Sequence, residues 1–138
     1  VSSCASHTIV PRAEALDIAG KIVSDDRLAN HDTNAPPLIV KDVLLVEGRD
    51  DLAIVVCELS GLPQGHALLI RRHTSPPEEL AVFSGTQYVA VEAVTSRQTS
   101  EGTVITVKHI TGRGNDAGTE ELLVRTNGSL QWLKKINP

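Results

Sequence analysis

From residue 38 to the C-terminus, turn-forming residues interrupt short apolar stretches about every ten residues, and this spacing constrains the fold more than any other feature. Strands at such spacing, with no helical pattern between them, are typical of an antiparallel meander, a sandwich or a barrel. The sequence therefore predicts a mainly β fold of about eight antiparallel strands. We expect them at residues 38–47, 52–59, 66–73, 80–83, 87–95, 103–111, 120–126 and 129–136.

The first two of these stretches define the predicted centre of the sheet. Both are rich in β-branched residues, and residues 48–51, Gly-Arg-Asp-Asp, separate them as the turn of a hairpin. The second stretch, residues 52–59, is apolar on both of its faces. A strand that is buried on both faces lies inside a sheet rather than at its edge, so we expect this stretch to be central.

Residues 12–28 carry the only helical pattern. The steps of three and four between apolar residues predict one short N-terminal helix, with Ala15, Leu16, Ala19, Ile22 and Val23 on one side. Gly20 weakens helix propensity by about 1 kcal/mol, so two strands broken at that glycine are the alternative.

The whole chain, residues 1–138, is predicted to form a single domain. Its first part, residues 1–37, would supply an irregular arm or edge strand, the helix and a polar loop. The rest, residues 38–138, would form the antiparallel sheet.

Charge and composition limit the classes of partner. The formal net charge is −4, and the chain has one Phe, one Tyr and one Trp. Nucleic-acid binding normally requires a basic face, and single-strand binders also use aromatic side chains for stacking. No apolar run approaches the roughly 18 residues that a membrane span needs. We therefore expect another protein as the partner, with neither nucleic acid nor a membrane span.

The two cysteines, Cys4 and Cys57, are too far apart in sequence for a metal or redox motif. The sequence predicts either a disulfide between them, which requires an oxidising compartment, or two unrelated thiols. The start of the chain, Val-Ser-Ser-Cys, has the pattern of a lipoprotein cleavage site with a lipid anchor at Cys4, unless the chain simply begins there. A bacterial periplasmic or secreted location follows as a hypothesis.

No pattern of catalytic or metal-binding residues stands out. Five histidines lack the spacing of metal ligands and are interpreted as surface residues: His7, His31, His66, His73 and His109. Adjacent carboxylates such as Glu120 and Glu121 are interpreted as solvated residues at strand ends. The sequence therefore predicts no enzyme, no metal and no cofactor.

Two longer connections, residues 96–102 and 111–118, are the predicted binding loops, because long polar loops on a rigid sheet often carry binding residues. Their candidate partner-binding residues are Arg97, Gln98, Ser100, Arg113, Asn115 and Asp116.

These features favour a non-enzymatic protein-binding module. Its most concrete form is a periplasmic inhibitor or immunity protein that blocks the active site of a cell-wall hydrolase or toxin effector. A β-barrel for a small apolar ligand and an envelope or secretion-system assembly subunit are the alternatives. No motif identifies a family.

Overall fold

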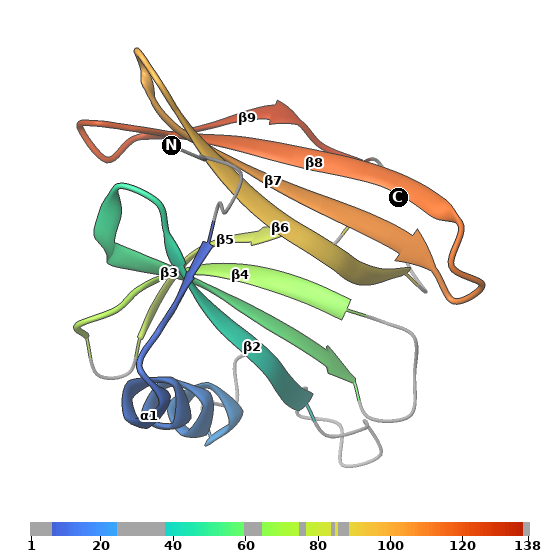
Figure 1. The fold of residues 1–138 in the computed structure, drawn as a ribbon, viewed down its shortest axis with the longest axis horizontal. Coiled ribbons are helices and arrows are strands. Elements are labelled where there is room, and N and C mark those ends of the chain that lie inside the picture. Colours follow the sequence, from blue (N-terminus) through green and yellow to red (C-terminus); the bar gives the residue numbers. More distant parts are fainter. Residues whose placement is uncertain are drawn as a thin grey trace.

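Two antiparallel sheets stack face to face, and one helix lies against the outer side of the first sheet (Figure 1). The computed structural model describes residues 7–24, 38–59, 65–74, 77–83, 85 and 89–136. The first sheet has the strand order β1-β2-β3-β4-β5 and the second β6-β7-β8-β9. The elements are β1 His7–Ile9, α1 Arg12–Ser24, β2 Leu38–Val46, β3 Arg49–Leu59, β4 Gly65–Arg71, β5 Glu78–Phe83, β6 Val89–Thr99, β7 Gly102–Thr111, β8 Asp116–Arg125 and β9 Leu130–Lys134.

The predicted mainly β fold with one short N-terminal helix is confirmed, and of the predicted architectures it is a sandwich of two meanders. The described part of the chain has nine strands instead of about eight. The additional strand is β1, at the edge of the first sheet, where the sequence left an irregular arm or an edge strand open.

The main core fills the space between the sheets. Alternate side chains of each strand point inward, and burial of their apolar surface drives the sheets together. The largest contributions come from Leu69 and Phe83 of the first sheet and from Ile105 and Leu122 of the second, all fully buried. Phe83 also meets Trp132 of β9 edge to face, with ring centroids 5.0 Å apart.

A second apolar cluster lies on the other face of the first sheet, under α1. Ile18 and Ile22 are one helical turn apart and pack with Val43, Val55 and Leu68 of the sheet. Strand β3 is thus covered on both faces, as its sequence predicted.

Gly20 lies on the exposed side of α1 with open space around it, so its low propensity does not break the helix. The alternative of two strands is wrong, and the predicted residues 25–28 of the helix lie outside the described residues.

One partly buried ion pair anchors α1 to the sheet. Arg72 follows β4, and its Nε and Nη2 atoms donate to the two carboxylate oxygens of Glu14 at 2.7 and 2.5 Å. Arg72 also donates to the backbone carbonyl of Asp50, and only 10% of its side chain is exposed. The two-point contact between guanidinium and carboxylate fixes the orientation of the helix as well as its distance from the sheet.

The predicted four-residue turn at 48–51 is wrong. The turn is Glu47-Gly48, and β3 begins at Arg49. Gly48 has a φ of +78°, which allows this tight reversal. The charged residues join the strand because Arg49 Nη2 and Asp51 Oδ2 pair at 3.0 Å, so their charges are compensated within the sheet.

The predicted loop at 96–102 is also wrong. Strand β6 continues to Thr99 and β7 begins at Gly102, so Ser100 and Glu101 alone form the turn. Polar residues fit into this part of β6 because two of them form hydrogen bonds with Glu47, in the turn between β2 and β3. Ser96 accepts a hydrogen bond from the Glu47 amide at 3.3 Å, and Gln98 donates to the Glu47 carbonyl.

The outer edge of β2 is only partly covered. The three residues of β1 pair with Leu44, Leu45 and Val46, after which the chain turns at Pro11 into α1. In the described part of the chain, no strand pairs with the outer edge of β2 before Val43. Among the described residues, the first half of β2 therefore has no strand on its outer side, and it lies next to the helix.

Replacement of Gly102 by alanine should destabilise the protein by at least about 2 kcal/mol. Gly102 has a φ of +148°, and a Cβ there would collide with the carbonyl oxygen of Val124. The control is Gly20→Ala, which should stabilise the exposed side of α1 by about 1 kcal/mol. Urea denaturation of both variants measures the difference, and equal stabilities would contradict this account of the β6–β7 turn.

Candidate functional site

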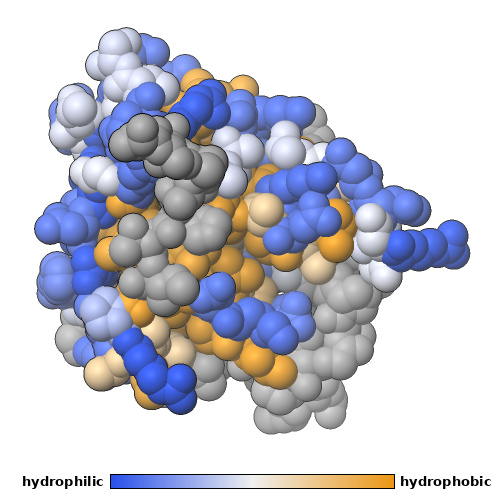
Figure 2. Space-filling model, viewed as in Figure 1, coloured by the Kyte–Doolittle hydropathy of each residue, from blue (hydrophilic) through white to orange (hydrophobic). Residues whose placement is uncertain are grey.

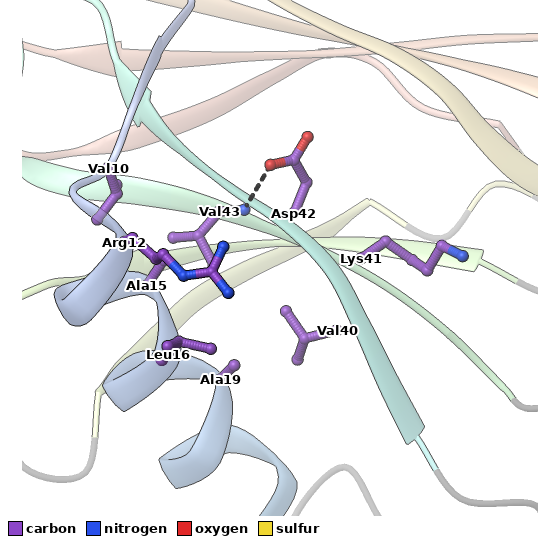
Figure 3. A pocket seen from close by; sticks show the side chains of 9 residues that line it. All are labelled: Val10, Arg12, Ala15, Leu16, Ala19, Val40, Lys41, Asp42 and Val43. Atoms are coloured by element: carbon purple, nitrogen blue, oxygen red, sulfur yellow. Dashed lines mark hydrogen bonds between the residues drawn. The ribbon is translucent and has the colours of Figure 1, made fainter.

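An apolar groove of about 330 Å³ lies between α1 and β2. It is open to solvent on one side (Figure 3). The helix contributes Arg12, Ala15, Leu16 and Ala19, the strand contributes Val40, Lys41, Asp42 and Val43, and Val10 lies at one end. Figure 2, drawn in the view of Figure 1, shows hydrophobic residues at the surface near α1, among hydrophilic ones.

The helical and strand periodicities produce this groove. Ile18 and Ile22 occupy the buried side of α1, which leaves Leu16, two residues before Ile18 and therefore on a different side of the helix, 61% exposed. Val40 contributes to the apolar cluster under the helix. The groove is therefore a continuation of that cluster to the surface.

The charged residues of the groove differ in their orientation. Figure 3 shows Arg12 reaching from the first turn of α1 toward β2, whereas Lys41 and Asp42 point away from the helix. The Asp42 carboxylate accepts a hydrogen bond from the Val43 amide at 3.1 Å, and Lys41 Nζ lies 3.7 Å from a carboxylate oxygen of Glu58. Arg12 forms no ion pair within the residues that the structure describes.

The structure places the candidate residues of the predicted first loop mainly in a strand. Arg97 and Gln98 belong to β6 and are paired with Val104 and Thr103 of β7, and only Ser100 lies in the turn. Arg97 lies 3.6 Å from a carboxylate oxygen of Glu121 on the outer face of the second sheet. These side chains are therefore held by the sheet rather than presented on a long loop.

The second predicted loop exists in shortened form. It spans residues 112–115 and carries Arg113 and Asn115 exposed at its tip, while Asp116 is the first residue of β8. One of the two connections precedes the ten-residue strand β7 and the other follows it. At a rise of about 3.3 Å per residue along a strand, the two connections are separated by roughly 30 Å. The structure does not bring the six candidate residues into one site.

A buried polar cluster was missed by the sequence analysis. His109 of β7 and Glu120 of β8 are both 0% exposed, so their interpretation as surface residues is wrong. His109 Nε2 lies 2.9 Å from Glu120 Oε1, which also accepts a hydrogen bond from the Gly85 amide at 2.9 Å. Lys135 Nζ, after β9, lies 3.0 Å from Glu120 Oε2.

The charge state of Glu120 follows from these contacts. Burial alone would raise its pKa, but the hydrogen bonds from His109, Lys135 and Gly85 outweigh burial and lower the pKa to about 2. An ionised carboxylate only accepts hydrogen bonds, so His109 Nε2 carries the proton. Neither side chain of the His109–Glu120 pair reaches solvent, so the cluster joins β7 and β8 inside the sandwich.

The period of the strands contained the signal for this cluster. Ile105 and Val107 point into the core, and the next residue with the same orientation is His109. Glu120 precedes Leu122 and Val124 in the same way on β8. Extending each inward-facing row by two residues would have placed both polar side chains inside the sandwich.

Cys57 is a buried free thiol whose Sγ lies 3.7 Å from the carbonyl oxygen of His66. Burial, with some contribution from Glu58 and Glu79, raises its pKa to about 12. The predicted partner Cys4 lies outside the described residues, so both the disulfide and the lipid anchor stay predictions.

Within the described residues, no three side chains of the metal-binding types lie close enough together to hold an ion. The same residues contain no helix that is both long and apolar enough to cross a membrane.

Comparisons with known proteins add no assignment: no family model, no curated protein and no solved structure matches this chain. The groove, the edge of β2 and the buried cluster are therefore interpreted from their own chemistry.

Replacement of Glu120 by glutamine should lower the stability at pH 7 by on the order of 3 kcal/mol, because Lys135 and the Gly85 amide lose an ionised partner. The folded-state pKa of about 2 is below the ordinary value of 4.5. The stabilisation is therefore complete above about pH 4.5 and is lost as the pH falls through about 2.

Urea denaturation between pH 2 and 7 measures this dependence. Glu121→Gln is the control, because the adjacent carboxylate is partly exposed on the outer face and should change the stability by less than about 1 kcal/mol. A wild-type and Glu120→Gln difference that does not vary with pH would contradict the assigned charge state.

Cys57 should resist a maleimide reagent in the native protein and react in denaturant without any reductant, because the structure has it as a buried free thiol. Intact mass after labelling checks this, with Cys4→Ser as the control that isolates Cys57. A requirement for reductant in the wild-type chain would instead establish the disulfide with Cys4.

Proposed function

We propose that this protein is a non-enzymatic binding module that takes a segment of another protein in the groove between α1 and β2. The observation that carries the proposal is the exposed apolar surface of the groove next to an open strand edge. Apolar surface that is concave and surrounded by polar residues is typical of protein-binding sites. The groove lies on two regular elements that are packed onto the core, so its shape exists before a partner arrives.

The interior of the sandwich favours this proposal over a carrier of small apolar ligands. The cavity lined by Leu44, Ile54, Val94 and Ile105 between the sheets has a volume of about 10 Å³, whereas ligand sites usually measure about 300–1,000 Å³. The groove between α1 and β2 has an apolar lining and a volume within the usual range for ligand sites. It is, however, open to solvent rather than enclosed.

The buried cluster supports a role without catalysis. A general acid or base has to reach the substrate within hydrogen-bond distance, directly or through one water molecule. His109 and Glu120 are fully buried, and Glu120 is already occupied by three further donors besides His109: the amides of Gly85 and Ile136 and the ammonium of Lys135. Stabilising the fold accounts for all of these contacts.

The inhibitor or immunity role in the periplasm remains the most specific form of the proposal. It now depends on the groove together with the exposed tip at residues 112–115, since the other predicted loop is part of a hairpin. The free thiol of Cys57 gives the periplasmic or secreted location no support of its own.

A photoreactive phenylalanine derivative at position 16 should form a covalent adduct with another protein when the full chain is irradiated in its cell of origin. The control places the same derivative at Leu133 of β9, because that leucine is also exposed, at 45%, but lies on the second sheet. Mass spectrometry identifies the adduct. Adducts from neither position, or equal yields from both, would contradict a site in the groove.

The variant Ala19→Asp supplies a second control. It places a negative charge in the apolar lining without changing the photoreactive position. The yield at position 16 should fall severalfold, because a charge that loses water on binding is costly. An unchanged yield would mean that the adduct reflects contact with the exposed outer side of α1 and not occupation of the groove.

A further inference from the structure

The open edge of β2 limits the conformation of the segment that the groove can hold. Strand β1 pairs with β2 from Leu44 to Val46, the Val10 amide donates to the Val43 carbonyl at 3.5 Å, and Pro11 then directs the chain away into α1. In an antiparallel sheet, alternate residues of an edge strand direct their N–H and C=O groups away from the sheet. Val10, which follows β1, lies at one end of the groove, and Val40 and Val43 of β2 line it (Figure 3), so a strand that continued β1 alongside β2 would run along the groove.

Apolar side chains are available on both sides of this edge. Leu16 of α1 faces the groove and is 61% exposed, and Ile39 of β2 is 42% exposed. Successive residues of a strand point to opposite faces, so Ile39 lies on the face opposite to Val40, which belongs to the groove. An extended segment along β2 would therefore contact Leu16 with one set of alternate side chains and Ile39 with the other.

The charge in the groove selects the chemistry of the segment. Arg12 reaches over the groove and lacks an ion pair among the described residues, whereas Lys41 and Asp42 point away and are engaged with Glu58 and Val43. A carboxylate on the bound segment would pair with Arg12 in surroundings from which apolar side chains exclude water. Such a contact is stronger than an exposed ion pair.

We propose that the occupant of the groove is an extended segment of a different protein, which adds to the first sheet as a strand beside residues 38–42 and carries an acidic side chain that pairs with Arg12. This inference rests on the proposed function and specifies its partner. Main-chain hydrogen bonds to the edge of β2 supply affinity, and the alternating apolar and acidic side chains supply specificity.

The same charges disfavour a second copy of this chain as the occupant. Pairing two β2 edges would bring Arg12 and Lys41 of one copy close to those of the other. Like charges across adjacent strands are destabilising. Lys41 also sits at an irregularity in the pairing of β2 with β3, and charges and bulges at an edge discourage self-association. The arrangement therefore selects an acidic partner and discriminates against self-pairing.

The test uses a panel of fluorescent six-residue peptides with valine, isoleucine or leucine at alternate positions and one glutamate among the remaining positions. Binding to the full chain is followed by fluorescence anisotropy in dilute salt. At least one glutamate peptide should bind saturably, and its lysine counterpart should bind at least about tenfold more weakly. Failure of every glutamate peptide to bind overturns the proposal.

Backbone methylation distinguishes strand addition from other modes of binding. Two versions of the binding peptide carry N-methyl groups on odd or on even residues. Because only one edge of an added strand pairs with β2, one version should lose binding at least about tenfold and the other should retain it. Equal effects of the two versions overturn strand addition, whereas an adduct at position 16 would still support the proposed function.

The variant Arg12→Glu tests the charge assignment. It should weaken the glutamate peptide at least about tenfold and strengthen the lysine peptide. The control Lys134→Glu makes the same change of net charge at an exposed position of β9, which lies far from α1 in Figure 1, and should leave both affinities unchanged. Equal effects of the two variants would overturn the pairing with Arg12. An adduct at position 16 that consists of a second copy of this chain would overturn the choice of partner.

Discussion

Covering both faces of the first sheet is the constraint on which the rest of the structure depends. Strands β3 and β4 are apolar on both sides, so the sheet requires a cover on each. The second sheet covers one face, with Leu69 and Phe83 facing Ile105 and Leu122. Helix α1 covers the other through Ile18 and Ile22. Either face left in water would expose large apolar side chains at a substantial cost in free energy.

The groove is a consequence of how α1 meets this requirement. The helix has 13 residues and its orientation is fixed by the two-point contact between Glu14 and Arg72. Strand β1 has to end early for the chain to enter the helix at Arg12. The same short connection that brings α1 onto the sheet therefore leaves the first half of β2 without an outer strand within the part of the chain that the structure describes. The way in which one face of the sheet is covered thus produces an apolar groove at its edge.

The buried cluster performs a different task at the junction of the sheets. Glu120 joins β8 to His109 of β7, to the Gly85 amide and to Lys135 after β9. Lys135 Nζ also lies 3.4 Å from the carbonyl oxygen of Val82 in β5, and it stacks over Trp132 at 4.2 Å from the ring centroid. Polar groups of the second sheet and the edge of the first thus share one buried carboxylate. Such a network favours one arrangement of the sheets, because alternatives leave charges buried without partners.

The sequence by itself determined the class of fold, the helix and most strands, because the period of apolar residues reports directly which face of an element is buried. It placed β3 at the centre of its sheet for that reason. The turn-forming residues at 48–51 and 96–102 led to wrong predictions of a turn and a loop. In the structure, pairing within strands and contacts with Glu47 keep these polar residues in the sheet. Only the tertiary structure decided which elements meet. The groove needs Arg12 and Leu16 next to Val40, and the buried cluster needs His109 next to Glu120 and Lys135. These pairs are distant in sequence, and no local pattern encodes the packing that brings them together.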